Sequence, residues 1–84
     1  MGHFVYILYS ISRDRYYVGS TSDLEERLNR HNAGATTSTK SGRPWKVVYS
    51  EEFLTRSDSL KRENEIKRQK SRVYIEGLID RNAG

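Results

Sequence analysis

The first hydrophobic run, residues 3–10, reads His-Phe-Val-Tyr-Ile-Leu-Tyr-Ser and is apolar at nearly every position. A short run rich in aromatic and β-branched residues, without alternation, is typical of a strand buried on both faces in the middle of a sheet. Polar residues 12–15 follow as a turn, and residues 16–18 (Tyr-Tyr-Val) begin a second short strand. The pattern therefore predicts a β-hairpin that ends at Gly19.

Capping signals predict where the helices begin. Ser22 is followed three residues later by Glu25, which is the spacing of a capping box, so a helix is predicted from here to about Asn32. A second capping signal at residues 55–58 predicts another helix over residues 57–70. Both helices carry many polar residues and few apolar ones.

The remaining segments complete the predicted fold. Gly34 stops the first helix, residues 34–43 have the small polar composition of a loop, and residues 45–49 (Trp-Lys-Val-Val-Tyr) predict a third strand. Ser71 caps a last short helix. The order β-β-α-β-α-α indicates an α+β fold in a single domain, residues 1–84, with helices covering the sheet because three strands alone are not stable in water.

The composition narrows the possible chemistry. The chain has no cysteine and two histidines, His3 and His31, which excludes disulfide scaffolds, thiolate zinc sites and cysteine nucleophiles. Any metal is expected on oxygen ligands, as Mg²⁺ prefers. The longest apolar run, residues 4–9, is far too short to cross a bilayer, and no basic segment precedes it. We therefore expect a cytoplasmic protein without a membrane segment or signal peptide.

The charge points to an acidic partner. The net charge is +4 and the isoelectric point is about 9.6, a balance typical of domains that bind nucleic acid. Basic side chains gather in residues 61–72 and around the predicted loop, either as an ordinary solvated surface or as a set of phosphate contacts. The candidates for phosphate contacts are Lys40, Arg43, Lys46, Lys67 and Lys70.

A carboxylate falls on the apolar side of the second helix. Leu60 and Ile66 are the only large apolar residues of that helix, and at 100° per residue Glu63 lies midway between them. Burying a carboxylate there is unfavourable unless something pairs with it. Either Lys67, four residues on, forms a salt bridge with Glu63, or Glu63 lines a cleft and holds a cation.

Two basic side chains lie beside the apolar stripe of the first helix, which Leu24 and Leu28 form. Arg27 and His31 are four residues apart and lie on the same side. Arg27 could extend its guanidinium to solvent while His31 interacts with the helix dipole. The other interpretation is a cation pair that faces a phosphate, since Arg grips phosphate oxygens and His exchanges protons near neutral pH.

Tyr6 and Tyr17 lie on neighbouring strands, where a tyrosine pair is usually a packing contact. Their motifs, Phe-Val-Tyr at 4–6 and Tyr-Val-Gly at 17–19, stand in order with the capped helix, an Arg-Pro-Trp stretch at 43–45 and Glu63. This ordered combination covers nearly the whole chain. It resembles the GIY-YIG nuclease superfamily, in particular its small free-standing bacterial members related to the nuclease domain of structure-selective endonucleases.

The resemblance implies three antiparallel strands with the first strand central, and hydrolysis of DNA phosphodiester bonds with one divalent metal ion, Mg²⁺ or else Mn²⁺. It places Tyr6, Tyr17, Arg27, His31 and Glu63 in the active site, so we expect them to converge on one concave basic face. Glu63 would hold the metal and Arg27 would neutralise charge on the phosphoryl oxygens. Tyr6 is the candidate general base if nearby cations lower its pKa, with Tyr17 positioning water or phosphate, unless His31 relays the proton.

A second class of function stays open at this point. A nucleic-acid-binding module that keeps the nuclease fold without turnover would use the same basic residues. Such a binder has no reason to hold Glu63 among phosphates, because a carboxylate without a metal repels them. We therefore favour the nuclease over the binder, and over a protein-interaction domain. So small a domain predicts weak sequence preference, and the pattern leaves open whether a protein partner or a homodimer is needed.

Overall fold

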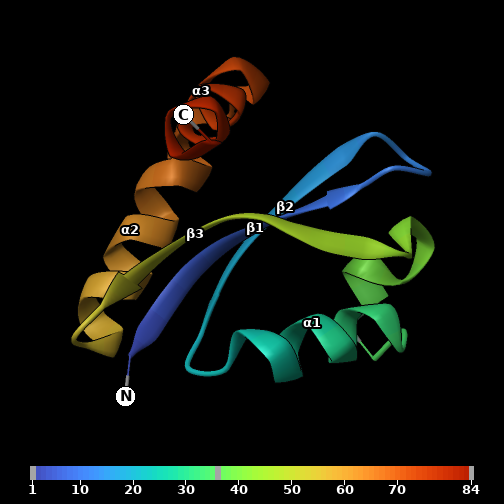
Figure 1. Cartoon of the computed structure of the whole chain (residues 1–84), viewed down its shortest axis with the longest axis horizontal. Helices are drawn as coiled ribbons and strands as arrows, with labels where there is room; N and C mark the ends of the chain where they lie inside the picture. Colours follow the sequence, from blue (N-terminus) through green and yellow to red (C-terminus); the bar gives the residue numbers. More distant parts are fainter. Residues whose placement is uncertain (1, 36, 84) are drawn as a thin grey trace.

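A computed structural model describes residues 2–35 and 37–83 of the chain. Three strands form one antiparallel sheet in the order β2-β1-β3, so the first strand is central. Within these residues, three α-helices and one 3-10 helix accompany the sheet (Figure 1). The elements are β1 (His3–Ser10), β2 (Arg15–Thr21), α1 (Leu24–Asn32), η1 (Thr37–Gly42), β3 (Trp45–Phe53), α2 (Arg56–Gln69) and α3 (Arg72–Ala83). The α+β class, the element order and the central first strand are confirmed.

Several predicted boundaries are wrong. The second strand does not end at Gly19, because β2 stays paired with β1 as far as Thr21. The third strand extends to Phe53, and the predicted loop 34–43 contains η1, with residue 36 outside the described residues. Asp23, not Ser22, caps α1, because its carboxylate accepts a hydrogen bond from the Glu26 amide at 3.0 Å.

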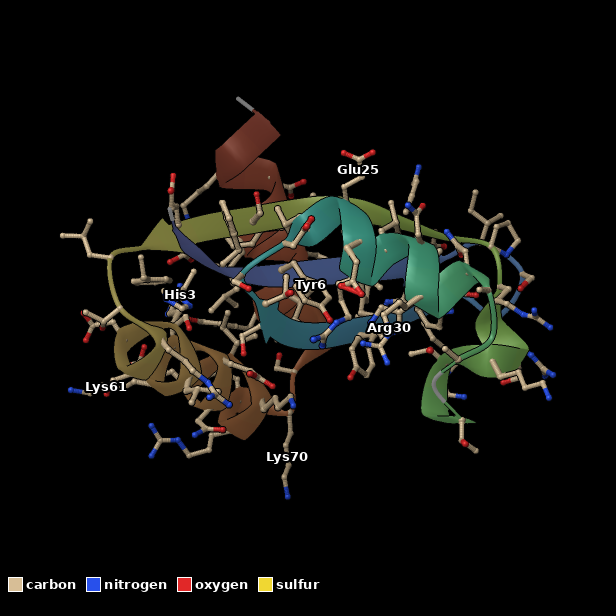
Figure 2. All side chains as sticks on the ribbon, turned by 90° about the horizontal axis from the view of Figure 1, so that it is seen from below. His3, Tyr6, Glu25, Arg30, Lys61 and Lys70 are labelled. Carbon is tan, nitrogen blue, oxygen red and sulfur yellow. The ribbon has the colours of Figure 1, made fainter. Side chains whose placement is uncertain are left out.

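Helices cover both faces of the sheet, which explains why β1 is apolar at almost every position. One face of β1 carries Val5 and Ile7, which pack in a core with residues of α2 and α3, including Ile66 and Leu78. The other face carries Tyr6 and Leu8 beneath α1 (Figure 2). The partners on this second face are Tyr17, Leu24, Leu28 and Trp45.

The helix α2 is held by one apolar anchor and by polar contacts. Ile66 is 1% exposed, whereas Leu60 is 39% exposed and does not pack as the helical wheel predicted. The Arg62 guanidinium instead bridges α2 to Glu51 of β3 at 3.1 Å and to the Tyr74 hydroxyl of α3 at 3.3 Å. Polar contacts therefore fix much of the orientation of α2, which carries the candidate carboxylate.

The caps predicted for the last two helices are confirmed. The Thr55 hydroxyl accepts from the Asp58 amide at 3.1 Å, and the Ser71 hydroxyl accepts from the Tyr74 amide at 3.2 Å. Over residues 2–35 and 37–83, the structure contains no helix with the length and apolar character needed to span a membrane.

Candidate active site

Tyr6 reaches from the central strand across the edge strand. Tyr6 pairs with Gly19 in the β1–β2 ladder, so the two residues lie on the same face of the sheet. An ideal Cβ at Gly19 would lie 2.5 Å from the Tyr6 hydroxyl oxygen. Position 19 therefore requires glycine, because the Tyr6 side chain lies so close to its backbone that any side chain there would displace the tyrosine ring.

A buried chain of polar side chains extends from this hydroxyl. Tyr6 is 3.0 Å from Nε2 of His31, and Nδ1 of the same imidazole is 2.8 Å from the Thr39 hydroxyl. All three side chains are at most 1% exposed. The Tyr17 ring packs edge-on against His31 with its centroid 4.9 Å away. The sheet, α1 and η1 therefore hold one connected group of a phenol, an imidazole and a hydroxyl.

Burial sets the protonation of this group. It raises the pKa of Tyr6 to about 12, reinforced by Tyr17 and by the negative charge of Glu63, while Arg27 opposes the shift. Burial also lowers the pKa of His31, and the positive charges of Arg27 and Arg30 lower it further. Two expectations are corrected here. The lowered pKa of His31 favours its neutral imidazole over a cation pair with Arg27, and nearby cations do not bring the Tyr6 pKa below its ordinary value.

Arg27 lies between the tyrosine and a cleft. Its guanidinium is close enough to the Tyr6 hydroxyl to lower the pKa of that group. Its Nε is buried and has no hydrogen-bond partner among the described residues. A buried donor without a partner is unfavourable by about 1–3 kcal/mol. The cleft has a volume of about 360 Å³ and is lined by His3, Ser20, Thr21, Ser22, Arg27, Arg56 and Leu60.

Glu63 approaches the edge strand from α2. Its carboxylate accepts a hydrogen bond from the Ser20 hydroxyl at 2.7 Å and is paired with the Lys67 ammonium at 2.6 Å. The side chain is 14% exposed. Of the two alternatives for Glu63, the salt bridge with Lys67 is present in the structure, and the Glu63 charge also acts on Tyr6.

The sequence predicted that the five candidate residues lie on one face. In the structure they do not share one face of the sheet. Four of them lie on the α1 face, while α2, which carries Glu63, packs on the opposite face. The two groups meet around β2, where Gly19 lies against Tyr6 and the next residue, Ser20, binds Glu63. Because β2 is an edge strand, no other strand of the described residues stands beside it on that side.

The carboxylate fits a metal that needs few protein ligands. Among residues 2–35 and 37–83 no three His, Cys, Asp or Glu side chains gather as a metal cage. Mg²⁺ keeps several waters and takes one or two carboxylates together with substrate phosphate oxygens. Each Glu63 oxygen accepts one hydrogen bond and has capacity for another contact. Glu63 can therefore serve as the single protein ligand of such an ion.

The predicted phosphate-binding residues form two separate groups. Lys67 and Lys70 line a surface hollow of about 600 Å³ on α2, together with Lys61, Asn64 and Arg68. The other three lie in or beside η1 and at the start of β3, on the opposite side of the view in Figure 1. These three are Lys40, Arg43 and Lys46, and the Arg43 guanidinium donates to the Lys40 carbonyl at 2.9 Å.

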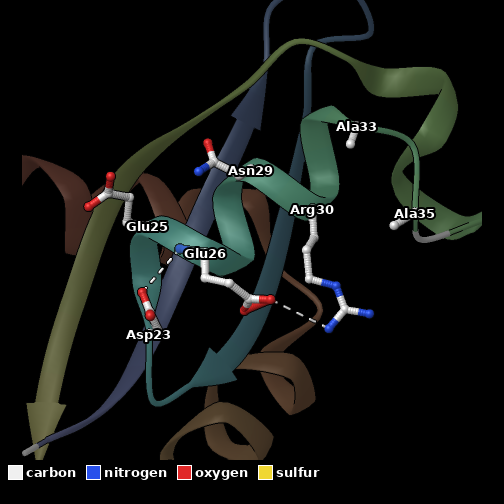
Figure 3. Close-up of a pocket in the computed structure, with 7 residues that line it drawn as sticks. All are labelled: Asp23, Glu25, Glu26, Asn29, Arg30, Ala33 and Ala35. Atoms are coloured by element: carbon white, nitrogen blue, oxygen red, sulfur yellow. Dashed lines mark hydrogen bonds and ion pairs between the residues drawn. The ribbon is translucent and has the colours of Figure 1, made fainter.

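A second hollow, on the outer side of α1, lacks the features of a phosphate site. It has a volume of about 460 Å³ and is lined by Asp23, Glu25, Glu26, Asn29, Arg30, Ala33 and Ala35. Figure 3 shows these side chains on the side of α1 that is turned away from the sheet. Asp23 caps the helix and Glu26 pairs with Arg30 at 3.7 Å, so its polar groups stabilise α1 itself.

Sequence reasoning missed three residues that organise the site. The sequence pattern ends a strand at Gly19, gives no reason to select Ser20, and predicts a loop around Thr39. The alternation of β2 places Ser20 on the face that α2 covers, and this signal was readable once the strand was extended to Thr21. The contact between Thr39 and His31 has no sequence signal, because it depends on how η1 folds back onto α1.

Comparisons with known proteins point to one family. A family model described as the GIY-YIG catalytic domain matches residues 2–76. A UPF0213 protein of Haloquadratum walsbyi is 42% identical over 84 residues, which cover 95% of this chain and 93% of that protein. A UPF0213 protein of Staphylococcus epidermidis is 40% identical over 80 residues, covering 89% of this chain and 96% of that protein. The solution NMR structure of a UPF0213 protein from Bacillus halodurans superposes with a TM-score of 0.62 at 30% identity, covering 100% of this chain and 88% of that chain.

Proposed function

The chain belongs to the GIY-YIG family, and on this premise we propose that it is a DNA endonuclease. The enzyme would use one divalent metal ion, Mg²⁺ or Mn²⁺, and residues 1–84 would form its single domain. The observation that carries the proposal is that four chemically different side-chain groups lie close together around the edge strand β2. A buried phenol paired with an imidazole lies beside a guanidinium whose Nε has no partner among the described residues, with a carboxylate next to them. Phosphodiester hydrolysis needs a proton acceptor, a cation for the phosphoryl oxygens and a metal ligand.

Glu63 and Arg27 would handle the charge of the reaction. Glu63 would hold the metal ion, which when bound would supply Lewis acidity for the scissile phosphate. Arg27 donates to the non-bridging oxygens, and its Nε is in place before the substrate arrives because the surrounding side chains bury it. Donors fixed in advance need no reorganisation as charge develops. Water attacks phosphorus, the bond to the 3′-oxygen breaks, and a 5′-phosphate and a 3′-hydroxyl result.

The buried chain of hydroxyl and imidazole would move the proton. A pKa of about 12 makes free tyrosinate rare at neutral pH, so Tyr6 alone is a poor base. If Nδ1–H of His31 donates to Thr39, then Nε2 accepts the Tyr6 proton across 3.0 Å. Tyr6 can then take the proton of the attacking water while it passes its own to His31, without ionising first. Tyr17, packed against His31, would position that water or the phosphate.

One observation favours a different function, a binding module without turnover. Lys67 already neutralises Glu63 at 2.6 Å, and a neutralised carboxylate no longer repels phosphates strongly. Glu63 could then lie beside bound DNA without any metal. The basic surface of α2 supports either function, because phosphate contacts provide most of the affinity for DNA in both.

The test compares cleavage and binding in the same preparations. Branched, flapped, single-stranded and duplex DNA are incubated with the parent with and without Mg²⁺ or Mn²⁺, alongside Glu63→Gln and Arg27→Ala. Glu63→Gln should abolish cleavage and bind DNA at least as tightly as the parent. Arg27→Ala should cleave about 10²–10³-fold more slowly, as for loss of an oxyanion donor. Glu25→Gln, an exposed carboxylate on the outer side of α1, is the matched control.

The outcomes separate the two functions. Cleavage by folded Glu63→Gln at the parent rate would overturn the metal-ligand assignment, and cleavage without divalent metal would overturn the mechanism. Tight binding with no cleavage of any substrate identifies the binder. In either case the affinity should fall steeply from low to physiological salt, and replacing Lys67 and Lys70 together with Ala should weaken binding alike for different sequences.

A further inference from the structure

The cleft beside Arg27 extends beyond the groups that the proposed chemistry uses. It lies where β2 ends, and its walls come from β1, β2, α1 and α2. His3, Arg27 and Arg56 each bring a basic side chain from a different element, and none of the lining residues is acidic. Three separate elements thus direct nitrogen donors into one hollow of about 360 Å³.

The two arginines of this cleft differ from the arginines that form ion pairs, although Arg13, Arg15 and Arg68 also have no ion pair among the described residues. Within the described residues neither Arg27 nor Arg56 has a carboxylate within 4.0 Å of its guanidinium. Three other arginines are ion-paired with carboxylates, at 3.1–3.7 Å in two cases and 2.5 Å in the third: Arg62, Arg30 and Arg72. The positive charge of the cleft is therefore not neutralised by the fold.

Both arginines are also placed where they weaken the folded state. Arg56 is the first residue of α2, directly after the N-cap Thr55, where a cation lies at the positive end of the helix dipole and is therefore unfavourable. Arg27 buries an Nε without a partner among the described residues. An anion in the cleft would remove both penalties at once, and a single bound phosphate offers enough oxygens for both side chains.

The floor of the cleft adds an apolar contact. Leu60 lines it and is 39% exposed, so an apolar surface lies next to the cationic walls. A nucleotide presents this same combination, since its phosphate carries the charge and the carbon face of its deoxyribose is apolar. The volume suits a small ligand of that size.

We propose that this cleft binds a second backbone phosphate of the DNA strand, with its deoxyribose against Leu60, next to the phosphate that is cut. Arg27 borders both sites, while His3 and Arg56 contact only the second phosphate. The proposal rests on the proposed function and extends it, because it specifies that the strand runs from Tyr6 and Glu63 past Ser20 towards the start of α2. Arg56 and His3 are thus binding residues that position the scissile bond.

The experiment neutralises one phosphate at a time. Single methylphosphonates are placed at successive positions on both sides of the cleavage point, or along a fixed duplex if no cleavage is seen, and binding is measured by fluorescence anisotropy without divalent metal. Parent, Arg56→Ala and His3→Ala are compared, with Arg81→Ala as a charge-matched control on α3. Losing one charge-assisted contact should weaken binding about 10-fold. On unmodified DNA, Arg56→Ala should bind about 10-fold more weakly than the parent. At one methylphosphonate position the parent should lose affinity, whereas Arg56→Ala should lose none beyond the effect of the mutation.

Each outcome decides the proposal. Equal methylphosphonate sensitivity in parent and Arg56→Ala at every position would overturn it, and so would an Arg81→Ala loss as large as that of Arg56→Ala. Because Arg56 is exposed at the start of α2, its removal should leave the melting temperature unchanged or slightly higher, and Arg56→Lys should recover most of the binding. If the parent cuts no DNA but Arg56 still couples to one phosphate, the nuclease proposal fails and the phosphate site stands. If the parent cuts DNA but Arg56 couples to no phosphate, the nuclease proposal stands and the phosphate site fails.

Discussion

Replacing Gly19 by alanine should damage both the stability and the chemistry of this domain through a single contact. The new Cβ would lie 2.5 Å from the Tyr6 hydroxyl oxygen and 2.7 Å from the ring carbon that carries it. The Tyr17 ring, 3.2 Å away, closes the space on another side. The backbone at Gly19 has no positive φ, so alanine is accommodated locally and the whole effect comes from the displaced tyrosine.

The size of the effect follows from these distances. Ordinary contacts begin at 3.4 Å, so Tyr6 must move by about 0.9 Å, which takes its hydroxyl out of the 3.0 Å hydrogen bond with His31. Forcing one extra methyl into a packed core destabilises by about 1–3 kcal/mol, which in a domain of this size lowers the melting temperature by at least about 4 °C. A misplacement near 1 Å at reacting groups slows cleavage about 10²-fold.

The assay needs a control for glycine replacement as such, and the chain provides one. Gly77 lies within α3, and a Cβ added there would meet no atom within 4 Å, so Gly77→Ala should raise stability by about 1 kcal/mol through helix propensity alone. Melting curves and cleavage rates of both variants are measured beside the parent. Parent-like cleavage by folded Gly19→Ala would refute the argument that Tyr6 acts from this position, and parent-like stability would refute the contact itself.

Two further predictions concern the buried imidazole. Thr39→Val removes the hydroxyl 2.8 Å from Nδ1 of His31, so it should destabilise by about 1–3 kcal/mol and shift the pH profile of cleavage, whereas Thr37→Val, exposed in η1, should do neither. Because the pKa of His31 is lowered by burial and by Arg27 and Arg30, the folded state binds fewer protons than the unfolded chain. Stability should therefore be fully present above pH 6.5 and fall below it, and a melting temperature just as acid-sensitive in His31→Asn would contradict this.

The fold was predictable because its local signals agree with one another. The continuous apolarity of β1 requires cover on both faces, and α1 and α2 provide it. Thr55 and Ser71 act as caps at the predicted positions. The error at the start of α1 falls where two signals compete, because Ser22 and Asp23 are both good N-caps. Strand β2 stays paired with β1 as far as Thr21, so the helix begins one residue later than predicted and Asp23 is its cap.

The candidate site was only partly predictable, because a helical wheel does not say which side of a sheet a helix covers. Arg27 and Glu63 were singled out correctly as polar residues in inward-facing positions, and both are half-buried. Their placement on opposite sides of the sheet depends on tertiary packing. The same holds for His31, since a helix pattern shows its direction but not that η1 will bury it against Thr39.

The pairing of Glu63 with Lys67 does not by itself oppose metal binding. The lysine side chain is 49% exposed, whereas the Glu63 side chain is 14% exposed, so the ammonium is the partner of this pair that can move into solvent. A divalent cation bound at Glu63 would replace the Lys67 ammonium, while Ser20, which binds the other carboxylate oxygen at 2.7 Å, would keep the side chain in place. The released ammonium remains next to the hollow that Lys67 shares with Lys70, where a DNA phosphate is its natural partner. If the domain is the proposed nuclease, the ion pair and the metal site would be successive states of one carboxylate, and binding of DNA and metal would reinforce each other.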